Sequence, residues 1–122
     1  MDDSQPVFIQ IMEIIENDII SGAYTVDDII VSTTQISKLY SVNPTTAVKA
    51  IGKLTDDGIL YKKPGIGMCV AEGAREKIIS RRKDIFLGST INKLLAEAKT
   101  LGITVKELTR VIENKEGVNK HD

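Results

Sequence analysis

The side chains that most often perform catalysis are scarce in this sequence. It has one cysteine, Cys69, and one histidine, His121, which precedes the last residue. A disulfide within the chain and a zinc site built from cysteine and histidine are therefore excluded. The serines, threonines and lysines have no histidine, cysteine pair or phosphate-binding loop beside them, because the glycine-rich stretch 65–67 lacks the Walker spacing. We therefore expect no enzymatic activity, no cofactor and no metal.

Hydroxyl, amide and lysine side chains gather instead between residues 32 and 67. Threonine can donate a hydrogen bond to phosphate or touch a thymine methyl group, and lysine can reach a guanine edge or a phosphate. Glycines in a turn let a backbone approach the minor groove closely. These residue types, in this order, favour contacts with double-stranded DNA. The candidate DNA-binding residues are Ser32, Thr33, Thr34, Asn43, Thr45, Thr46, Lys49, Lys53, Lys62, Lys63, Gly65 and Gly67.

Each of these stretches also has a purely structural explanation. The threonines at 45–46 could be ordinary exposed residues of a first helical turn, and the lysines at 62–63 could be solubilising charges on an edge strand. The glycines could serve turn geometry alone. Tyr40 and Tyr61 are expected at the edge of a core rather than stacked on bases. The basic run 81–83 could be a phosphate patch, although a solvated helix face explains it better.

Length and composition limit the class of protein. The chain has 122 residues, 42% of them hydrophobic and 27% charged, as in one globular domain or a small domain with an appendage. Lysine and arginine total 16 and acidic residues 17, so the net charge of −1 excludes a protein that coats nucleic acid by bulk charge. No apolar run approaches the ~20 residues of a membrane span. The acidic, polar start is not a secretory signal, so we expect a cytoplasmic protein.

The elements that must position the candidate residues are predicted from apolar spacing and helix caps. Apolar residues at helical spacing predict a helix over 6–21, and Gly22 suits a left-handed stop after it. A β-branched run at 29–31 is at most a brief strand. Ser32 and Gln35 then form a capping-box pattern, which predicts a second helix ending near residue 41.

A third helix and a hairpin follow. Asn43 is a good N-cap and Pro44 a good first residue for a helix over 44–57. Two short helices joined by a tight turn form a helix-turn-helix, here about 33–57. Strand, glycine-rich turn and strand over about 59–71 predict a β-hairpin, which at this place is the wing of a winged-helix domain. The third helix is expected to bury Ala47, Val48, Ile51 and Leu54.

The rest of the chain is predicted to be helical. A long helix over 75–99 contains Gly88-Ser89-Thr90 near its middle, which we expect to kink or break it. Thr104 and Glu107 form another capping-box pattern before a last helix. From Glu116 onward the sequence is expected to be a disordered tail.

The predicted fold class is mostly α with a small β-wing: a winged helix-turn-helix over 7–73, a two-helix module (a helical hairpin) over 74–115 and the tail 116–122. The two-helix module carries too many large apolar residues to face water. We therefore expect it to form a two-fold homodimer. Two recognition helices would then address two half-sites of a near-palindromic operator. The expected dimer interface is Ile85, Phe86, Leu87, Ile91, Leu94, Leu95, Leu108, Val111 and Ile112.

The order of these elements, and the stretches 41–50, 57–60 and 65–70, resemble the GntR family of bacterial transcription regulators. The motif match spans roughly 7–70. Val42-Asn43-Pro44-Thr45-Thr46 is the form typical of the YtrA-like subfamily, which is also short, with about two helices after the winged helix. The resemblance implies a transcription regulator of an operon, often one that encodes an ABC transporter.

One stretch departs from the family pattern. Where the family usually has Pro-Ser-Glu-Arg entering the second helix, this chain has Val31-Ser32-Thr33-Thr34, so Thr34 replaces the arginine that would contact DNA. Residues 1–72 contain no arginine, and their 5 lysines accompany 10 acidic residues, whereas residues 73–122 hold 11 basic and 7 acidic residues. With few cations available for phosphate, we expect modest affinity per monomer and strong salt sensitivity.

These observations predict a sequence-specific DNA-binding dimer, a repressor whose operator overlaps a promoter. Only ~45 residues follow the wing, too few to enclose a ligand pocket of ~300 Å³ within one chain. A small-molecule effector, of unknown identity, would therefore bind at the dimer interface or between domains. The alternative is a winged-helix protein–protein adaptor without DNA binding, which the acidic, arginine-free first half permits. Binding to random duplex DNA at low salt distinguishes the two.

Overall fold

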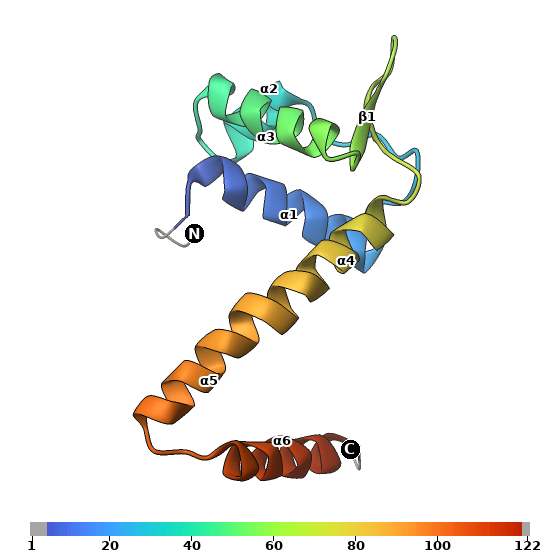
Figure 1. The fold of residues 1–122 in the computed structure, drawn as a ribbon. Helices are drawn as coiled ribbons and strands as arrows, with labels where there is room; N and C mark the ends of the chain where they lie inside the picture. Colours follow the sequence, from blue (N-terminus) through green and yellow to red (C-terminus); the bar gives the residue numbers. More distant parts are fainter. Residues whose placement is uncertain (1–4, 121–122) are drawn as a thin grey trace. The chain divides into compact units, whose positions relative to one another are not determined.

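The computed structural model describes residues 5–120, with side chains described up to residue 117. Three helices are followed by a two-stranded hairpin and a helical C-terminal part (Figure 1), so the prediction of a mostly helical fold with a small β-wing is confirmed. The chain forms two compact units, one ending at Arg81 and the other beginning at Arg82. No helix within residues 5–120 combines the length and the apolar character needed to cross a membrane.

Helix α1 (Val7–Ser21) buries an apolar stripe in the core of the first unit. Its buried residues include Ile11, Ile15 and Ile19, which recur at helical spacing. Gly22 ends the helix with φ 88°, a left-handed conformation that glycine adopts without steric cost, and its N–H donates to the Ile19 carbonyl. The predicted helix and its stop are both confirmed.

Helices α2 (Thr33–Leu39) and α3 (Pro44–Asp56) pack together as a helix-turn-helix. The Ser32 hydroxyl accepts a hydrogen bond from the Gln35 N–H, and the Gln35 side chain accepts one from the Ser32 N–H, which confirms the predicted capping box. Asn43 caps α3, with Pro44 in its first turn, again as predicted.

The inward face of α3 differs from the prediction at one position. Four residues are buried, whereas Val48 is 58% exposed, so the expectation that Val48 packs in the core is wrong. Successive helix residues lie about 100° apart around the axis. Because positions 47, 50, 51 and 54 form the buried stripe, position 48 lies beside this stripe and not within it. The buried residues of α3 are Ala47, Ala50, Ile51 and Leu54.

Strands β1 (Leu60–Lys63) and β2 (Gly67–Val70) pair antiparallel and form the predicted wing. Leu60 pairs with Val70, and both are buried in the core, so Tyr61 and its partner Cys69 lie on the opposite face of the hairpin. Ile29 bridges to Cys69 along the other edge of β2, where the sequence predicts a brief strand. Cys69 is fully buried, as expected of a packed thiol.

Helix α4 (Ala74–Ile85) begins within the first unit, where Ala74 joins the core. Arg81 donates from Nη2 to the carboxylate of Glu16 on α1, and its Nη1 lies 3.8 Å from Asp57 at the end of α3. Glu16 is only 2% exposed, so the guanidinium neutralises a carboxylate that has been removed from water. Arg81 therefore links α4 to α1 with its side chain still 39% exposed, whereas Lys83 of the run 81–83 is exposed, as expected of a solvated helix face.

The second unit contains the end of α4, the π-helical turn η1 (Phe86–Thr90), α5 (Ile91–Thr100) and α6 (Val105–Lys120). A kink or break was expected at residues 88–90. The helical chain is not broken there, because the π-helical turn η1 joins α4 to α5.

A turn with Gly102 at φ 72° follows α5, and helix α6 follows the turn. Thr104 and Glu107 form the predicted capping box at its start: the Glu107 N–H donates to the Thr104 hydroxyl at 3.1 Å and the Thr104 N–H donates to the Glu107 carboxylate at 3.4 Å. α6 extends to Lys120, so Glu116 to Lys120 are helical, whereas a tail was expected there. His121 and Asp122 lie outside the described residues.

Candidate nucleic-acid interface

In the first turn of α3, Asn43 and Thr45 are joined by two hydrogen bonds. The Asn43 side-chain oxygen accepts from the Thr45 N–H at 2.9 Å and from the Thr45 hydroxyl at 2.8 Å. Thr45 is exposed and Thr46 is half-buried. A phosphate contact in which Thr45 donates its hydroxyl hydrogen must therefore replace the bond to Asn43, while the Thr45 side chain remains accessible from outside.

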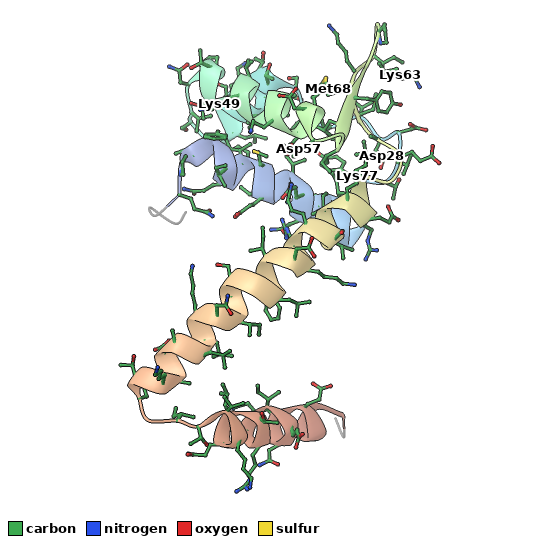
Figure 2. All side chains as sticks on the ribbon, viewed as in Figure 1. Asp28, Lys49, Asp57, Lys63, Met68 and Lys77 are labelled. Carbon is green, nitrogen blue, oxygen red and sulfur yellow. The ribbon has the colours of Figure 1, made fainter. Side chains whose placement is uncertain are left out.

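Lys49 and Lys53 lie four residues apart along α3, and both are exposed. The ammonium of Lys49 lies 4.2 Å from the ring centroid of Phe8 on α1, a cation–π contact. Such a contact at an exposed site contributes about 0.5–1 kcal/mol, little enough for a phosphate to displace it. Figure 2 shows Lys49 on α3 and Lys63 on the wing, so cationic groups occur on both elements. All five lysines of residues 1–72 are exposed.

The start of α2 offers less than the sequence predicts. Ser32 is used by the capping box, Thr33 is half-buried and Thr34 is exposed. The helix has only seven residues, so its dipole is short. Ser32 is exposed like Thr34, but its hydroxyl accepts the capping hydrogen bond from Gln35.

The wing exposes both of its lysines. Lys62 and Lys63 are neighbours in β1, so their side chains leave opposite faces of the hairpin. Gly65 has φ 77° and Gly67 has φ 136°, conformations that disfavour any residue with a Cβ. Turn geometry alone therefore requires both glycines, and a close approach to DNA would be an additional use of them.

Tyr61 connects the wing to the loop that follows α1. Its hydroxyl donates to the Asp27 carboxylate at 2.7 Å. This hydrogen bond to Asp27, with smaller contributions from burial and from the negative charge of Asp27, raises the pKa of Tyr61 to about 12. Tyr40 is partly buried against the core. Both tyrosines thus serve the fold, as the sequence analysis expects.

Two residues of α3 that the sequence does not single out for DNA contact are accessible from outside. Val48 is exposed, and a Cβ added to Gly52 would meet no atom within 4 Å. The spacing i, i+3, i+4, i+7 of positions 47, 50, 51 and 54 was the available signal, because it leaves positions 48 and 52 outside the buried stripe.

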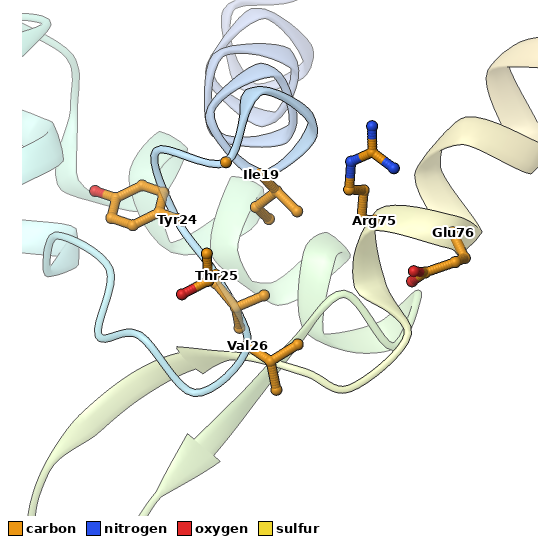
Figure 3. A pocket seen from close by; sticks show the side chains of 8 residues that line it. Ile19, Tyr24, Thr25, Val26, Arg75 and Glu76 are labelled. Atoms are coloured by element: carbon orange, nitrogen blue, oxygen red, sulfur yellow. The ribbon is translucent and has the colours of Figure 1, made fainter.

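A pocket of about 180 Å³ lies in the first unit, between the end of α1, the loop after it and the first turn of α4 (Figure 3). Arg75 donates from Nε to the Ile20 carbonyl at 3.0 Å, which ties α4 to α1 beside this pocket. Small-molecule sites usually measure ~300 Å³ or more, so the pocket is small for an effector. Its lining residues are Ile19, Gly22, Tyr24, Thr25, Val26, Val70, Arg75 and Glu76.

The second unit exposes almost all of its apolar side chains. Among residues 82–117, Ala98 alone is buried. Ile91 and Leu108 of the expected dimer interface are half-buried. The other seven residues are 39–67% exposed: Ile85, Phe86, Leu87, Leu94, Leu95, Val111 and Ile112.

A helix-turn-helix followed by a two-stranded β-wing defines a winged helix-turn-helix domain, and here α3 and the wing both carry exposed lysines. Residues 9–70 match the model of the bacterial regulatory proteins of the gntR family. The chain therefore belongs to the GntR family of DNA-binding transcription regulators, which are not enzymes.

Solved structures agree with this assignment. A transcriptional regulator described as of the GntR family, from Bacteroides thetaiotaomicron, is 31% identical, covers 96% of this chain and 100% of its own, and has a TM-score of 0.75. A GntR-family regulator from Listeria monocytogenes shares the fold at 24% identity, covering 93% of this chain and 98% of its own, with a TM-score of 0.71. The DNA-binding domain of AraR, solved in complex with operator ORR3, is 33% identical over 54% of this chain and 80% of its own, with a TM-score of 0.52. No curated protein matches the chain significantly.

Proposed function

We propose that the chain is a short repressor of the YtrA-like kind, which binds a near-palindromic operator as a homodimer and blocks transcription of an operon. Its length and its similarity to GntR-family structures over nearly the whole chain support the subfamily. An operon encoding an ABC transporter is the target that the sequence resemblance implies. The AraR domain bound to operator DNA supports a DNA-facing role for the matching half of this chain.

In this proposal α3 enters the major groove with its first turns, Asn43, Thr45 and Thr46. Lys49 and Lys53 neutralise phosphates beside the groove. The start of α2, residues 32–34, meets the backbone of the same half-site. The wing reaches the adjacent minor groove through Lys62 and Lys63 and through the backbone at Gly65 and Gly67.

The exposed apolar face of the second unit is the single observation that carries the dimer. A unit in which Ala98 alone is buried, among residues 82–117, has no core of its own, and apolar side chains in this number require a partner surface. A second copy of the same unit supplies one under two-fold symmetry. We propose DNA binding for residues 7–73 and dimerisation for residues 74–115, with the dimer contacts made after Arg81, where the second unit begins.

The test is a variant with Thr46→Ala and Lys49→Ala, assayed by gel shift on operator fragments selected from genomic DNA. We expect a folded dimer that has lost operator binding. The matched control, Lys99→Ala with Thr100→Ala, changes the same residue types on exposed positions of α5 and should bind normally. Full affinity of the first variant would reject the assignment of α3. Failure of the unaltered protein to bind any duplex at low salt would favour the adaptor.

A further inference from the structure

The outward side of α3 carries an apolar group that the fold does not use. Val48 is 58% exposed on a helix whose other aliphatic side chains, Ile51 and Leu54, are buried. A single exposed aliphatic residue is common in proteins and by itself indicates nothing. Its position is informative, because it lies in the first half of the helix that a winged helix-turn-helix protein places in the major groove.

We propose that Val48 reads a thymine methyl group in each operator half-site. This inference rests on the proposed operator binding and specifies its base chemistry. Valine has no hydrogen-bonding atom, so it cannot contact a phosphate or a polar base edge through a hydrogen bond. Thymine is the base that presents an apolar group, its C5-methyl, in the major groove. The branched valine side chain has one strongly preferred rotamer in a helix, so its two methyl groups form a rigid contact surface.

The groups on either side of Val48 leave room for an apolar base contact at this position. The Thr45 hydroxyl hydrogen is committed to Asn43. The Lys49 ammonium rests on Phe8, directed back toward α1. Residues 1–72 contain no arginine, the side chain that most often recognises guanine with two hydrogen bonds. The outward side of α3 is therefore better suited to apolar contacts than to a hydrogen-bonding code.

Gly52, four residues after Val48, leaves room for a surface to approach α3 closely. Glycine is among the poorest helix formers, and it persists here inside a helix without a positive φ that would require it. A Cβ added at Gly52 would meet nothing within 4 Å in the free protein, so no packing within the fold demands its absence. A closely apposed DNA duplex accounts for a residue that costs helix stability and serves no internal contact.

The experiment replaces single thymines of the selected operator by uracil, which removes the C5-methyl and leaves every hydrogen-bonding group. At one position in each half-site we expect uracil to weaken binding about fourfold, the effect of burying one methyl group. Val48→Ala should bind the thymine and uracil operators equally. Alanine is the better helix former, so this variant is expected to fold. The matched control, Val26→Ala, alters a valine outside α3 that is 50% exposed and should remain sensitive to uracil.

Two results would overturn the inference while leaving operator binding intact. One is an operator in which no thymine is sensitive to uracil. The other is a Val48→Ala variant that is as sensitive as the unaltered protein. Gly52→Ala gives an independent measure: we expect higher thermal stability together with weaker operator binding, and a variant that gains stability without losing affinity would also contradict it. A protein that binds no DNA at all would reject the proposed function itself.

Discussion

The two units of this chain differ sharply in how they treat apolar side chains. The unit ending at Arg81 buries aliphatic residues from α1, α2, α3, the wing and the start of α4 in one core. In the unit beginning at Arg82, Ala98 is the only buried side chain among residues 82–117. Both are helical, and both have well-formed caps and turns, so local structure does not explain the difference.

Of the two units, the first has the buried core that it needs to be stable in a single chain. Burial of apolar surface is the main stabilising contribution to folding, and the first unit obtains it internally. The second unit has regular helices but little to hold them in place, because short helices in water depend on packing against other elements. Its stability is therefore expected to depend on concentration, as it does in obligate dimers.

The largest expected effect concerns the exposed apolar face of the second unit. Leu94→Asp combined with Ile112→Asp places charges on the proposed dimer face, and we expect a monomer by light scattering at micromolar concentration. Operator affinity should fall about 100-fold or more, because the two recognition helices are no longer linked. Unfolding of the first unit should be unchanged. Asn92→Asp, on the same helix, should stay dimeric, and a double variant that also stays dimeric would remove the basis for the interface.

A smaller effect is expected inside the first unit. Arg81→Met leaves the buried Glu16 carboxylate without its guanidinium partner and should lower the free energy of unfolding by about 2 kcal/mol, less than for a fully buried pair because the Arg81 side chain is 39% exposed. Urea denaturation measures it. Lys83→Met, at an exposed position two residues later, serves as the control. Equal stability of the two variants would mean that this ion pair does not anchor α4.

The wing lysines should contribute to the dependence of DNA affinity on salt concentration. For each of Lys62 and Lys63 that meets a phosphate, replacement by alanine should reduce the slope of log affinity against log salt by ~0.9. Fluorescence anisotropy at several salt concentrations measures the slope. Lys106→Ala, in the second unit, should leave the slope unchanged. If all three variants have the same slope, neither Lys62 nor Lys63 contacts a phosphate.

The smallest expected effect concerns Tyr61. Folding raises its pKa from 10.0 to about 12, so the hydrogen bond to Asp27 stabilises the fold at pH below 10 and this stabilisation is lost as the pH rises from 10 to about 12. Tyr61→Phe should remove this pH dependence. The difference in phenolate absorbance between the two proteins should titrate near pH 12, whereas a difference that titrates near 10 would show that the bond is absent in solution.

The helix boundaries were largely predictable because their signals are local. Ser32 with Gln35, Asn43 with Pro44, and Thr104 with Glu107 each satisfy backbone groups of their own first turn, so sequence spacing of three or fewer residues contains the information. The same holds for Gly22 as a left-handed stop. The order of elements, and through it the fold class, followed from these signals.

Features set by contacts between distant residues were not predictable in this way. Whether Val48 is buried depends on which side of α3 meets α1. The partner of Lys49 is Phe8, and that of Arg81 is Glu16, each from another helix. The expected DNA-binding residues remain a prediction, since their contacts lie outside this chain.

The π-helical turn η1 has a consequence for the length of the chain. An extra residue in a regular α-helix rotates everything after it by about 100°, but a π-turn, whose hydrogen bonds reach five residues back, absorbs one residue within itself. Deleting Gly88 should thus convert η1 into an ordinary α-helical turn and leave Leu94 and Leu95 at nearly the same positions around the helix axis, relative to Ile85, as before. Light scattering should find the deletion variant still dimeric. At this turn the sequence can lose a residue without changing the apolar face of the helix.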